Sequence, residues 1–132
     1  MGSATELGRV RGLGSAKSGT HHWMMQRVTA IANLVLMTWL ATSLITSDFS
    51  SIDAVKMWLA KPAAAVPLAL LAMSAFTHIR LGLTVLIEDY VHGEAGKLAA
   101  ILALTFFTWG GLAFALFSIA ALAFGGAAHV GQ

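Results

Sequence analysis

The sequence contains no cysteine and very little charge. Its 132 residues include eight Lys or Arg and six Asp or Glu, which is 11% of the chain, whereas an average soluble domain carries about 25%. The absence of cysteine excludes disulfides, thiolate metal sites and cysteine nucleophiles. The shortage of charge, together with 58% hydrophobic residues, indicates a membrane protein rather than a soluble domain.

The few basic residues are scattered rather than clustered, so the charge pattern does not indicate nucleic acid binding. The first 19 residues, MGSATELGRVRGLGSAKSG, are rich in Gly and Ser and lack the apolar segment of a signal peptide. We expect residues 1–20 to form a flexible cytoplasmic arm, residues 21–126 to form a membrane domain and residues 127–132 to form a short tail.

Three apolar segments are long enough to cross roughly 30 Å of hydrocarbon, which takes about 20 helical residues. They run from about Trp23 to Ile45, from about Ala63 to Tyr90 and from about Leu98 to Phe124. None shows the alternating pattern of a strand, and within lipid only helices or closed barrels satisfy the backbone. The sequence therefore predicts an all-α protein with three transmembrane helices.

A short amphipathic segment, TSDFSSIDAVKMWLAKP, separates the first two spans. Within it, Ile52, Val55 and Leu59 recur at helical spacing. Trp58 is suited to the membrane interface, where tryptophan is enriched. We expect a short interfacial helix here, ended by Pro62, and only a brief loop over residues 91–97 between the second and third spans.

The basic residues outside the spans are unevenly divided between the two sides of the predicted membrane. Four lie on the side of the N-terminus and two on the other: Arg9, Arg11, Lys17 and Lys97 against Lys56 and Lys61. Because cytoplasmic loops carry the excess of Lys and Arg, this predicts a cytoplasmic N-terminus and a periplasmic C-terminus in a bacterial inner membrane. Asp89 and Tyr90 would then lie on the cytoplasmic side.

Three helices can hardly enclose a large cofactor or a pathway by themselves. The third span is rich in small residues, including Gly110 and Gly111, which permit close contact with other helices. The sequence therefore favours a subunit of a hetero-oligomer.

Residues 74–92, SAFTHIRLGLTVLIEDYVH, place His78 within the second span. A neutral imidazole offers one ring nitrogen to a haem iron or another metal. A histidine that packs against a neighbouring helix and hydrogen-bonds to it explains the residue about equally well. Ser74 and Gly82, one turn to either side, leave room for a flat macrocycle, but they also suit ordinary packing between helices.

His78 and Asp89 share one face of the predicted helix. Eleven residues correspond to about 1100° of rotation, so the two lie within ~20° of the same direction and ~16 Å apart along the axis. This face carries an imidazole inside the membrane and a carboxylate at its boundary, with Tyr90 beside the carboxylate. An interfacial tyrosine is typical of the aromatic belt, although its phenol could also hydrogen-bond the carbonyl of a quinone.

A second polar group opens the first span, where His21 and His22 precede Arg27. These residues fit an interfacial anchor with a snorkelling arginine. They fit a cationic clamp for an anion, such as a haem propionate, about equally well. Arg80 lies about 200° from His78 on its helix and so faces a different neighbour; the sequence assigns it no role.

Two motifs resemble the hydrophobic membrane-anchor subunit of succinate dehydrogenase, the smaller, cytochrome b-type subunit of its membrane part. One is H-x10-D-Y in the second of three helices, here His78, Asp89 and Tyr90. The other is GTHHWMMQRVTA at residues 19–30, where a His and an Arg lie six residues apart, here His21 and Arg27. The resemblance covers about residues 15–125, and the ending IEDYVH is most similar to the alphaproteobacterial branch.

The resemblance implies the membrane anchor of succinate:quinone oxidoreductase, respiratory complex II of the tricarboxylic acid cycle and aerobic electron transport. It implies that His78 is an axial ligand of haem b, with the second axial histidine supplied by a larger cytochrome b anchor subunit. It places His21 and Arg27 near the haem propionates. It also implies that Tyr90 hydrogen-bonds ubiquinone and that Asp89 helps to organise that site.

The same resemblance implies two further partners, a flavoprotein subunit with FAD and a subunit with iron–sulfur clusters, so that this chain has no succinate-oxidising site of its own. His92 acquires no role from it. The alternatives are a fumarate reductase anchor, a haem-free structural anchor and a small transporter subunit. Small multidrug transporters normally have four helices and a Glu in the first, whereas the first span here has no acidic residue.

Overall fold

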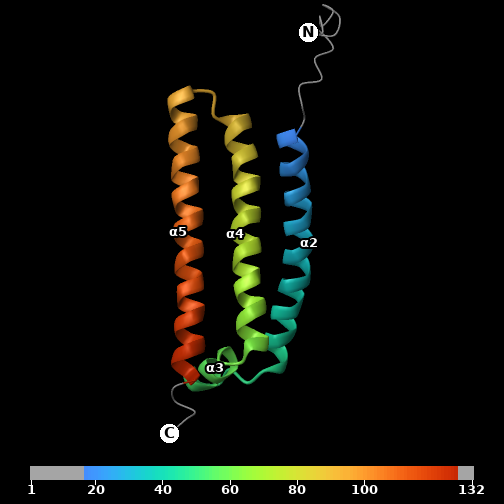
Figure 1. Ribbon diagram of the computed structural model, residues 1–132, viewed down its shortest axis with the longest axis vertical. Helices are drawn as coiled ribbons and strands as arrows, with labels where there is room; N and C mark the ends of the chain where they lie inside the picture. Colours follow the sequence, from blue (N-terminus) through green and yellow to red (C-terminus); the bar gives the residue numbers. More distant parts are fainter. Residues whose placement is uncertain (1–16, 128–132) are drawn as a thin grey trace, which may run out of the picture.

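The computed structural model describes residues 17–127, which form helices joined by short loops. Numbered as in Figure 1, the helices are α2 (Lys17–Thr46), α3 (Ile52–Leu59), α4 (Pro62–Tyr90) and α5 (Glu94–Ala127). Three of them are long and apolar enough to cross a membrane, over Gly19–Thr46, Pro62–Tyr90 and Glu94–Gly125. The predicted all-α architecture, with three candidate spans and a short helix after the first, is confirmed.

The long helices extend beyond the apolar segments that predicted them. α2 begins six residues before Trp23, and α5 begins four residues before Leu98. The prediction followed hydrophobicity, whereas a helix continues through polar residues once it leaves the hydrocarbon. Most of the expected N-terminal arm, residues 1–16, and the end of the expected tail, residues 128–132, lie outside the described residues.

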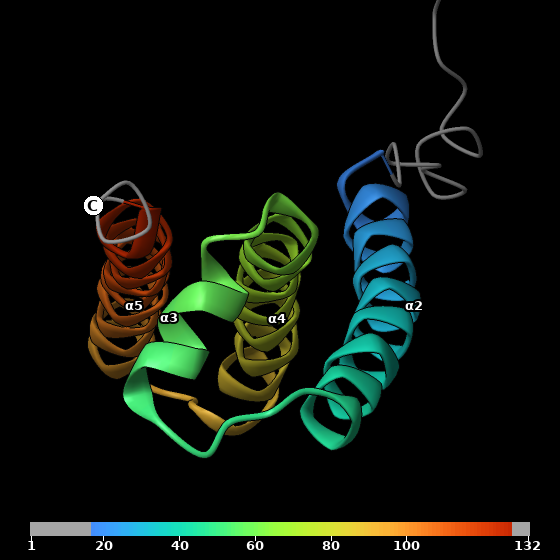
Figure 2. The ribbon, with the colours of Figure 1, turned by 90° about the horizontal axis from the view of Figure 1, so that it is seen from below.

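The three long helices form an open layer in which α4 is central (Figures 1 and 2). α4 contacts both α2 and α5, but α2 and α5 do not touch each other over their described lengths. Few hydrophobic side chains are buried in the described part of the chain: Leu59, Ala64, Leu71 and Leu104. The broad faces of the layer are therefore apolar surfaces for lipid or for other helices.

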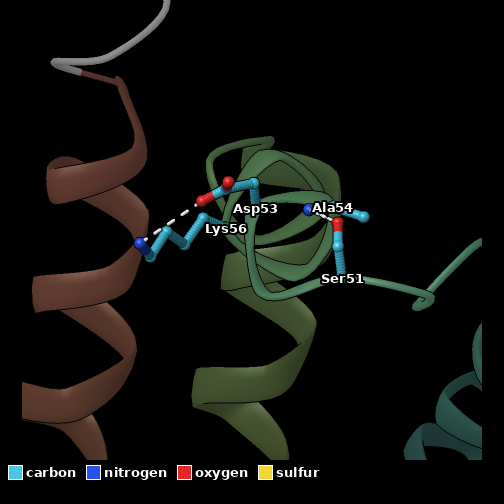
Figure 3. A network of polar contacts seen from close by, with 4 residues as sticks. All are labelled: Ser51, Asp53, Ala54 and Lys56. Atoms are coloured by element: carbon cyan, nitrogen blue, oxygen red, sulfur yellow. Dashed lines mark hydrogen bonds and ion pairs between the residues drawn. The ribbon is translucent and has the colours of Figure 1, made fainter.

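The short helix α3 begins with a capping interaction (Figure 3). The backbone N–H of Ala54 donates to Ser51 Oγ at 3.1 Å, which satisfies one of the free donors at the helix start. Lys56 Nζ lies 3.5 Å from Asp53 Oδ1, but such exposed ion pairs contribute little to stability.

Aromatic residues and one buried leucine attach α3 to the layer. The ring of Trp58 stacks on Trp39 of α2 at 6.0 Å between centroids, and Phe49 meets Trp58 edge-on at 5.3 Å. Leu59 is buried, and α3 packs against α4 and α5 across one end of the layer (Figure 2). α4 then begins at Pro62, where proline costs no helical hydrogen bond.

The close approach of α5 to α4 depends on Gly111. A Cβ added at this glycine would lie 2.6 Å from Cε1 of Phe76 on α4, closer than side-chain atoms normally approach. A Cβ at the neighbouring Gly110 would meet nothing within 4 Å. Of the two glycines that the sequence associates with helix contact, Gly111 alone meets another described helix.

We expect Gly111→Ala to destabilise the protein, because the Phe76 ring must move to admit the new methyl group. Overpacking of this kind typically costs about 1–3 kcal/mol. The control is Gly110→Ala, which adds the same methyl group to open space and should leave the midpoint of thermal unfolding in detergent unchanged or slightly higher. Equal midpoints for the two variants would contradict this account of α4–α5 packing.

Candidate functional site

His78 lies at the contact between α2 and α4. Its Nδ1 is 3.1 Å from Thr29 Oγ1 on α2. Ser74, one turn earlier on α4, donates from its Oγ to the Thr29 carbonyl at 3.1 Å. Thr29 is only 6% exposed, while His78 and Ser74 are half-buried. These three residues, which we call the Thr29 cluster, form a polar connection between two otherwise apolar helices.

Thr29 was not singled out from the sequence, and nothing in its local pattern distinguishes it. Its Oγ1 is also 2.8 Å from the Met25 carbonyl of its own helix. The exposed Thr38 and Thr42 bond in the same way to carbonyls four residues earlier, each at 2.7 Å. Only the packing of α2 against α4 shows that Thr29, unlike the other two, meets a side chain of the second span.

An apolar groove adjoins the Thr29 cluster between α2 and α4. Its volume is about 330 Å³, and it is lined by Met25, Val28, Thr29, Ala32, Leu36, Leu70, Met73, Ser74 and Thr77. On the other side of His78, a Cβ added at Gly82 would lie 3.9 Å from Gln26 Nε2. Ser74 and Gly82 therefore share a face with His78, as predicted, and this face is turned toward α2.

His21 and Arg27 lie toward the N-terminal end of α2, and both side chains are exposed. The guanidinium carbon of Arg27 is 5.2 Å from the centroid of the Trp23 ring, which is a cation–π contact. Arg27 precedes Thr29 by two residues, or ~3 Å along the axis, so its backbone is at a depth close to that of the Thr29 cluster. His21 is about 12 Å from Thr29 along the axis, toward the helix start.

Asp89 and Tyr90 end α4 and are exposed, Tyr90 by 75%. This end of α4 lies at the same end of the layer as the start of α2, so both residues share that end with His21 (Figure 1). His78 is ~16 Å from Asp89 along the helix axis. The structure thus has two separate polar positions, one inside the layer and one at its edge.

The loop after α4 is anchored at this same end. Lys97 Nζ donates to the Glu88 carbonyl at 3.3 Å, and the Lys97 backbone N–H donates to the Gly93 carbonyl at 2.8 Å. His92 lies between the helices and is exposed. These contacts hold the start of α5 against the end of α4, next to Tyr90.

Arg80 faces α5, away from the Thr29 cluster. Its guanidinium carbon lies 5.9 Å from the centroid of the Trp109 ring. A cavity of about 70 Å³ adjoins this contact, lined by Phe76, Thr77, Arg80, Leu81, Thr108, Trp109 and Leu112. This placement agrees with the rotation of about 200° between Arg80 and His78.

The described membrane helices hold a buried, unpartnered amide oxygen but no cluster of metal ligands. Within residues 17–127, no three His, Asp or Glu side chains come together as a metal site. The Oδ1 of Asn33, one turn after Thr29 on α2, is buried and has no hydrogen-bond partner among the described residues. Asn33 is a second interior polar residue that the sequence pattern did not single out.

The fold defines the class of the protein. Three long apolar helices, mostly exposed along their length, make this chain a multi-pass membrane protein. The family described as succinate dehydrogenase/fumarate reductase transmembrane subunit matches residues 1–112, and the chain belongs to that family.

Similar proteins carry a more specific description, "succinate dehydrogenase hydrophobic membrane anchor subunit". The protein of Rickettsia bellii is 32% identical over 103 residues, 78% of this chain and 82% of that protein. The protein of Rickettsia conorii is 38% identical over 87 residues (65% and 69%) and that of Paracoccus denitrificans 32% over 115 residues (86% and 88%). No solved structure matches. The chain is thus a membrane-anchor subunit of the succinate dehydrogenase type.

We expect Trp109→Leu to weaken the contact between α4 and α5, because it removes the aromatic face that Arg80 covers. Cation–π contacts contribute about 0.5–2 kcal/mol, depending on how far the pair is desolvated. Trp109→Phe retains an aromatic face and should lose less. The comparison is made by unfolding both variants in detergent, and a leucine variant as stable as the phenylalanine variant would refute the interaction.

Proposed function

We propose that this chain is the small anchor subunit of a succinate:quinone oxidoreductase that carries a b-type haem and reduces ubiquinone. His78 would bind the haem together with a histidine of a larger cytochrome b anchor subunit. The observation that carries the proposal is the position of His78. This residue is half-buried in a membrane helix, and among the described residues only its Nδ1 has a hydrogen-bond partner. The relatives described above are all succinate dehydrogenase anchors, which favours this function over fumarate reduction.

The residues around His78 fit a haem. Its Nε2 has no hydrogen-bond partner in the described part of the chain, and a neutral imidazole nitrogen is a common haem ligand. The groove beside it, which Ser74 helps to line, offers apolar surroundings, and Gly82 adds no side chain to the contact with α2. Arg27 lies at nearly the same depth, on the side of α2 turned away from Thr29, and its guanidinium would suit a propionate that extends past α2, with His21 closer to the aqueous end. When bound, the haem supplies a one-electron redox centre.

The ubiquinone site would lie at the end of α4. Reduction of a quinone to a quinol takes up two electrons and two protons. The exposed phenol of Tyr90 can donate a hydrogen bond to a quinone carbonyl, and the exposed carboxylate of Asp89 can pass protons from water. A site at the boundary of the membrane gives the quinone access from lipid and gives the protons access from solvent.

The remaining assignments follow from the same proposal. An iron–sulfur subunit would bring electrons from a flavoprotein subunit, in which FAD oxidises succinate, and would meet the anchor at the end that holds Tyr90. The excess of basic residues supports a cytoplasmic position for that end and a periplasmic C-terminus in a bacterial inner membrane. The exposed apolar faces of the layer leave room for lipid and for the larger anchor subunit.

We expect His78→Leu to abolish or strongly reduce the b-type signal in a dithionite-reduced minus oxidised spectrum of the purified complex. Leucine fills the site but offers no nitrogen to the iron. His92→Leu is the control, because it removes an exposed histidine outside the membrane helices and should retain the signal. A native complex without any haem signal, or a full signal in His78→Leu, would refute this role of His78.

We expect Tyr90→Phe and Asp89→Asn each to lower ubiquinone reduction by about tenfold, which corresponds to about 1.4 kcal/mol. Loss of one hydrogen bond is of this order. Succinate oxidation with an artificial electron acceptor that bypasses the membrane should be unchanged. Glu88→Gln is the matched control, since it neutralises the exposed neighbouring carboxylate; equal losses in this variant would argue against a specific site.

A further inference from the structure

We propose that Thr29 is a positioning residue, which holds the proton of the His78 imidazole on Nδ1 and leaves Nε2 free to bind the haem iron. The inference rests on the haem-binding role proposed for His78. The position of the proton, however, can be measured without haem.

A threonine hydroxyl has a single proton to donate and two lone pairs that can accept. Thr29 Oγ1 lies 2.8 Å from the Met25 carbonyl oxygen and 3.2 Å from the Gln26 carbonyl oxygen. Carbonyl oxygens only accept hydrogen bonds. An oxygen–oxygen contact of 2.8 Å with no proton between the atoms is repulsive, so the hydroxyl proton belongs to this contact within α2.

Because the hydroxyl proton of Thr29 is donated to a carbonyl of α2, its Oγ1 can only accept a hydrogen bond from His78. The two atoms Oγ1 and Nδ1 are 3.1 Å apart, which is within hydrogen-bonding distance. Nδ1 is therefore the donor and carries the proton. In a neutral imidazole, the lone pair is then on Nε2, the nitrogen with no partner in the described part of the chain.

The surroundings hold this arrangement in place. Thr29 is 6% exposed, so water has little access to replace His78 as the partner of its hydroxyl oxygen. The Ser74 hydroxyl donates to the Thr29 carbonyl at 3.1 Å, which fixes the backbone of α2 opposite His78. A histidine whose other N–H is held by an acceptor keeps both its tautomer and its ring orientation, and loss of such a partner typically weakens metal binding by about 10- to 100-fold.

The test compares three variants of the purified complex. Thr29→Val keeps the shape but removes the acceptor, Thr29→Ser keeps the hydroxyl, and Thr38→Val is the matched control. Thr38 lies on the same helix with the same backbone bond, but it is exposed. We expect haem affinity to fall about 10- to 100-fold in Thr29→Val and to remain near the native value in the other two.

A second readout needs no haem. In complex purified from cells that make no haem, ¹⁵N spectra of labelled histidine, with the His78 signal assigned by its loss in His78→Leu, show which ring nitrogen carries the proton. We expect the proton on Nδ1 in the native chain and in Thr29→Ser, and a shift toward Nε2 in Thr29→Val. A native His78 with its proton on Nε2 overturns the proposal, and this result requires no Thr29 variant to fold.

The outcomes separate the two proposals. If the native complex binds haem but Thr29→Val retains it as well as Thr38→Val does, the positioning role of Thr29 is wrong and haem binding by His78 stands. If the native complex binds no haem, the haem-binding function fails, and the positioning role toward the iron fails with it. The ¹⁵N spectra then still show whether Thr29 determines the position of the proton.

Discussion

The packing of α4 between α2 and α5 is the constraint on which the rest of the structure depends. One face of α4 meets α2 through the Thr29 cluster, and another meets α5 where Gly111 admits the Phe76 ring. Since α2 and α5 do not touch over their described lengths, α4 alone joins the layer along its spans. His78 and Arg80 are two residues apart, yet they belong to different contacts for this reason.

The polar residues of the spans show how the chain limits the cost of placing them in lipid. The hydroxyls of Thr29, Thr38 and Thr42 each donate to a backbone carbonyl of their own helix, so each is hydrogen-bonded without a partner from another helix. Arg80 covers an aromatic ring, and Arg27 does the same at the start of α2. The imidazole of His78 instead depends on a residue of another helix, which ties its placement to the fold.

The sequence predicts the parts of the fold that depend on the length of the hydrophobic segments and on the helical period. The three spans, the helix at Ile52–Leu59 and the shared face of Ser74, His78 and Gly82 follow from these two properties alone. Which side chains meet across the contacts between helices could not be predicted from these two properties. Thr29 has the same local surroundings as threonines that face outward, and the contact of Arg80 with Trp109 depends on how α5 packs against α4. The hydrophobic pattern also did not predict the helix ends, because α2 and α5 continue into polar residues past the hydrophobic segments.

The roles proposed for Tyr90 and Asp89 depend on what lies next to them. Both are exposed at the end of α4, and neither forms a closed site with the described residues of this chain. The roles proposed for them therefore rest on the H-x10-D-Y motif and on their exposure at the end of α4.

An open layer has a mechanical consequence that a closed bundle would not have. A closed bundle transmits the displacement of one helix to all others, because each has two neighbours. Here α2 meets α4 but not α5 along the spans, so a tilt of α2 against α4 acts directly on that one contact. Movement of α2 would thus change the distance between Thr29 and His78 while the Arg80–Trp109 contact stayed as it is. The two sides of the layer are joined along the spans by α4 and at one end by α3, whose Trp58 stacks on Trp39 of α2.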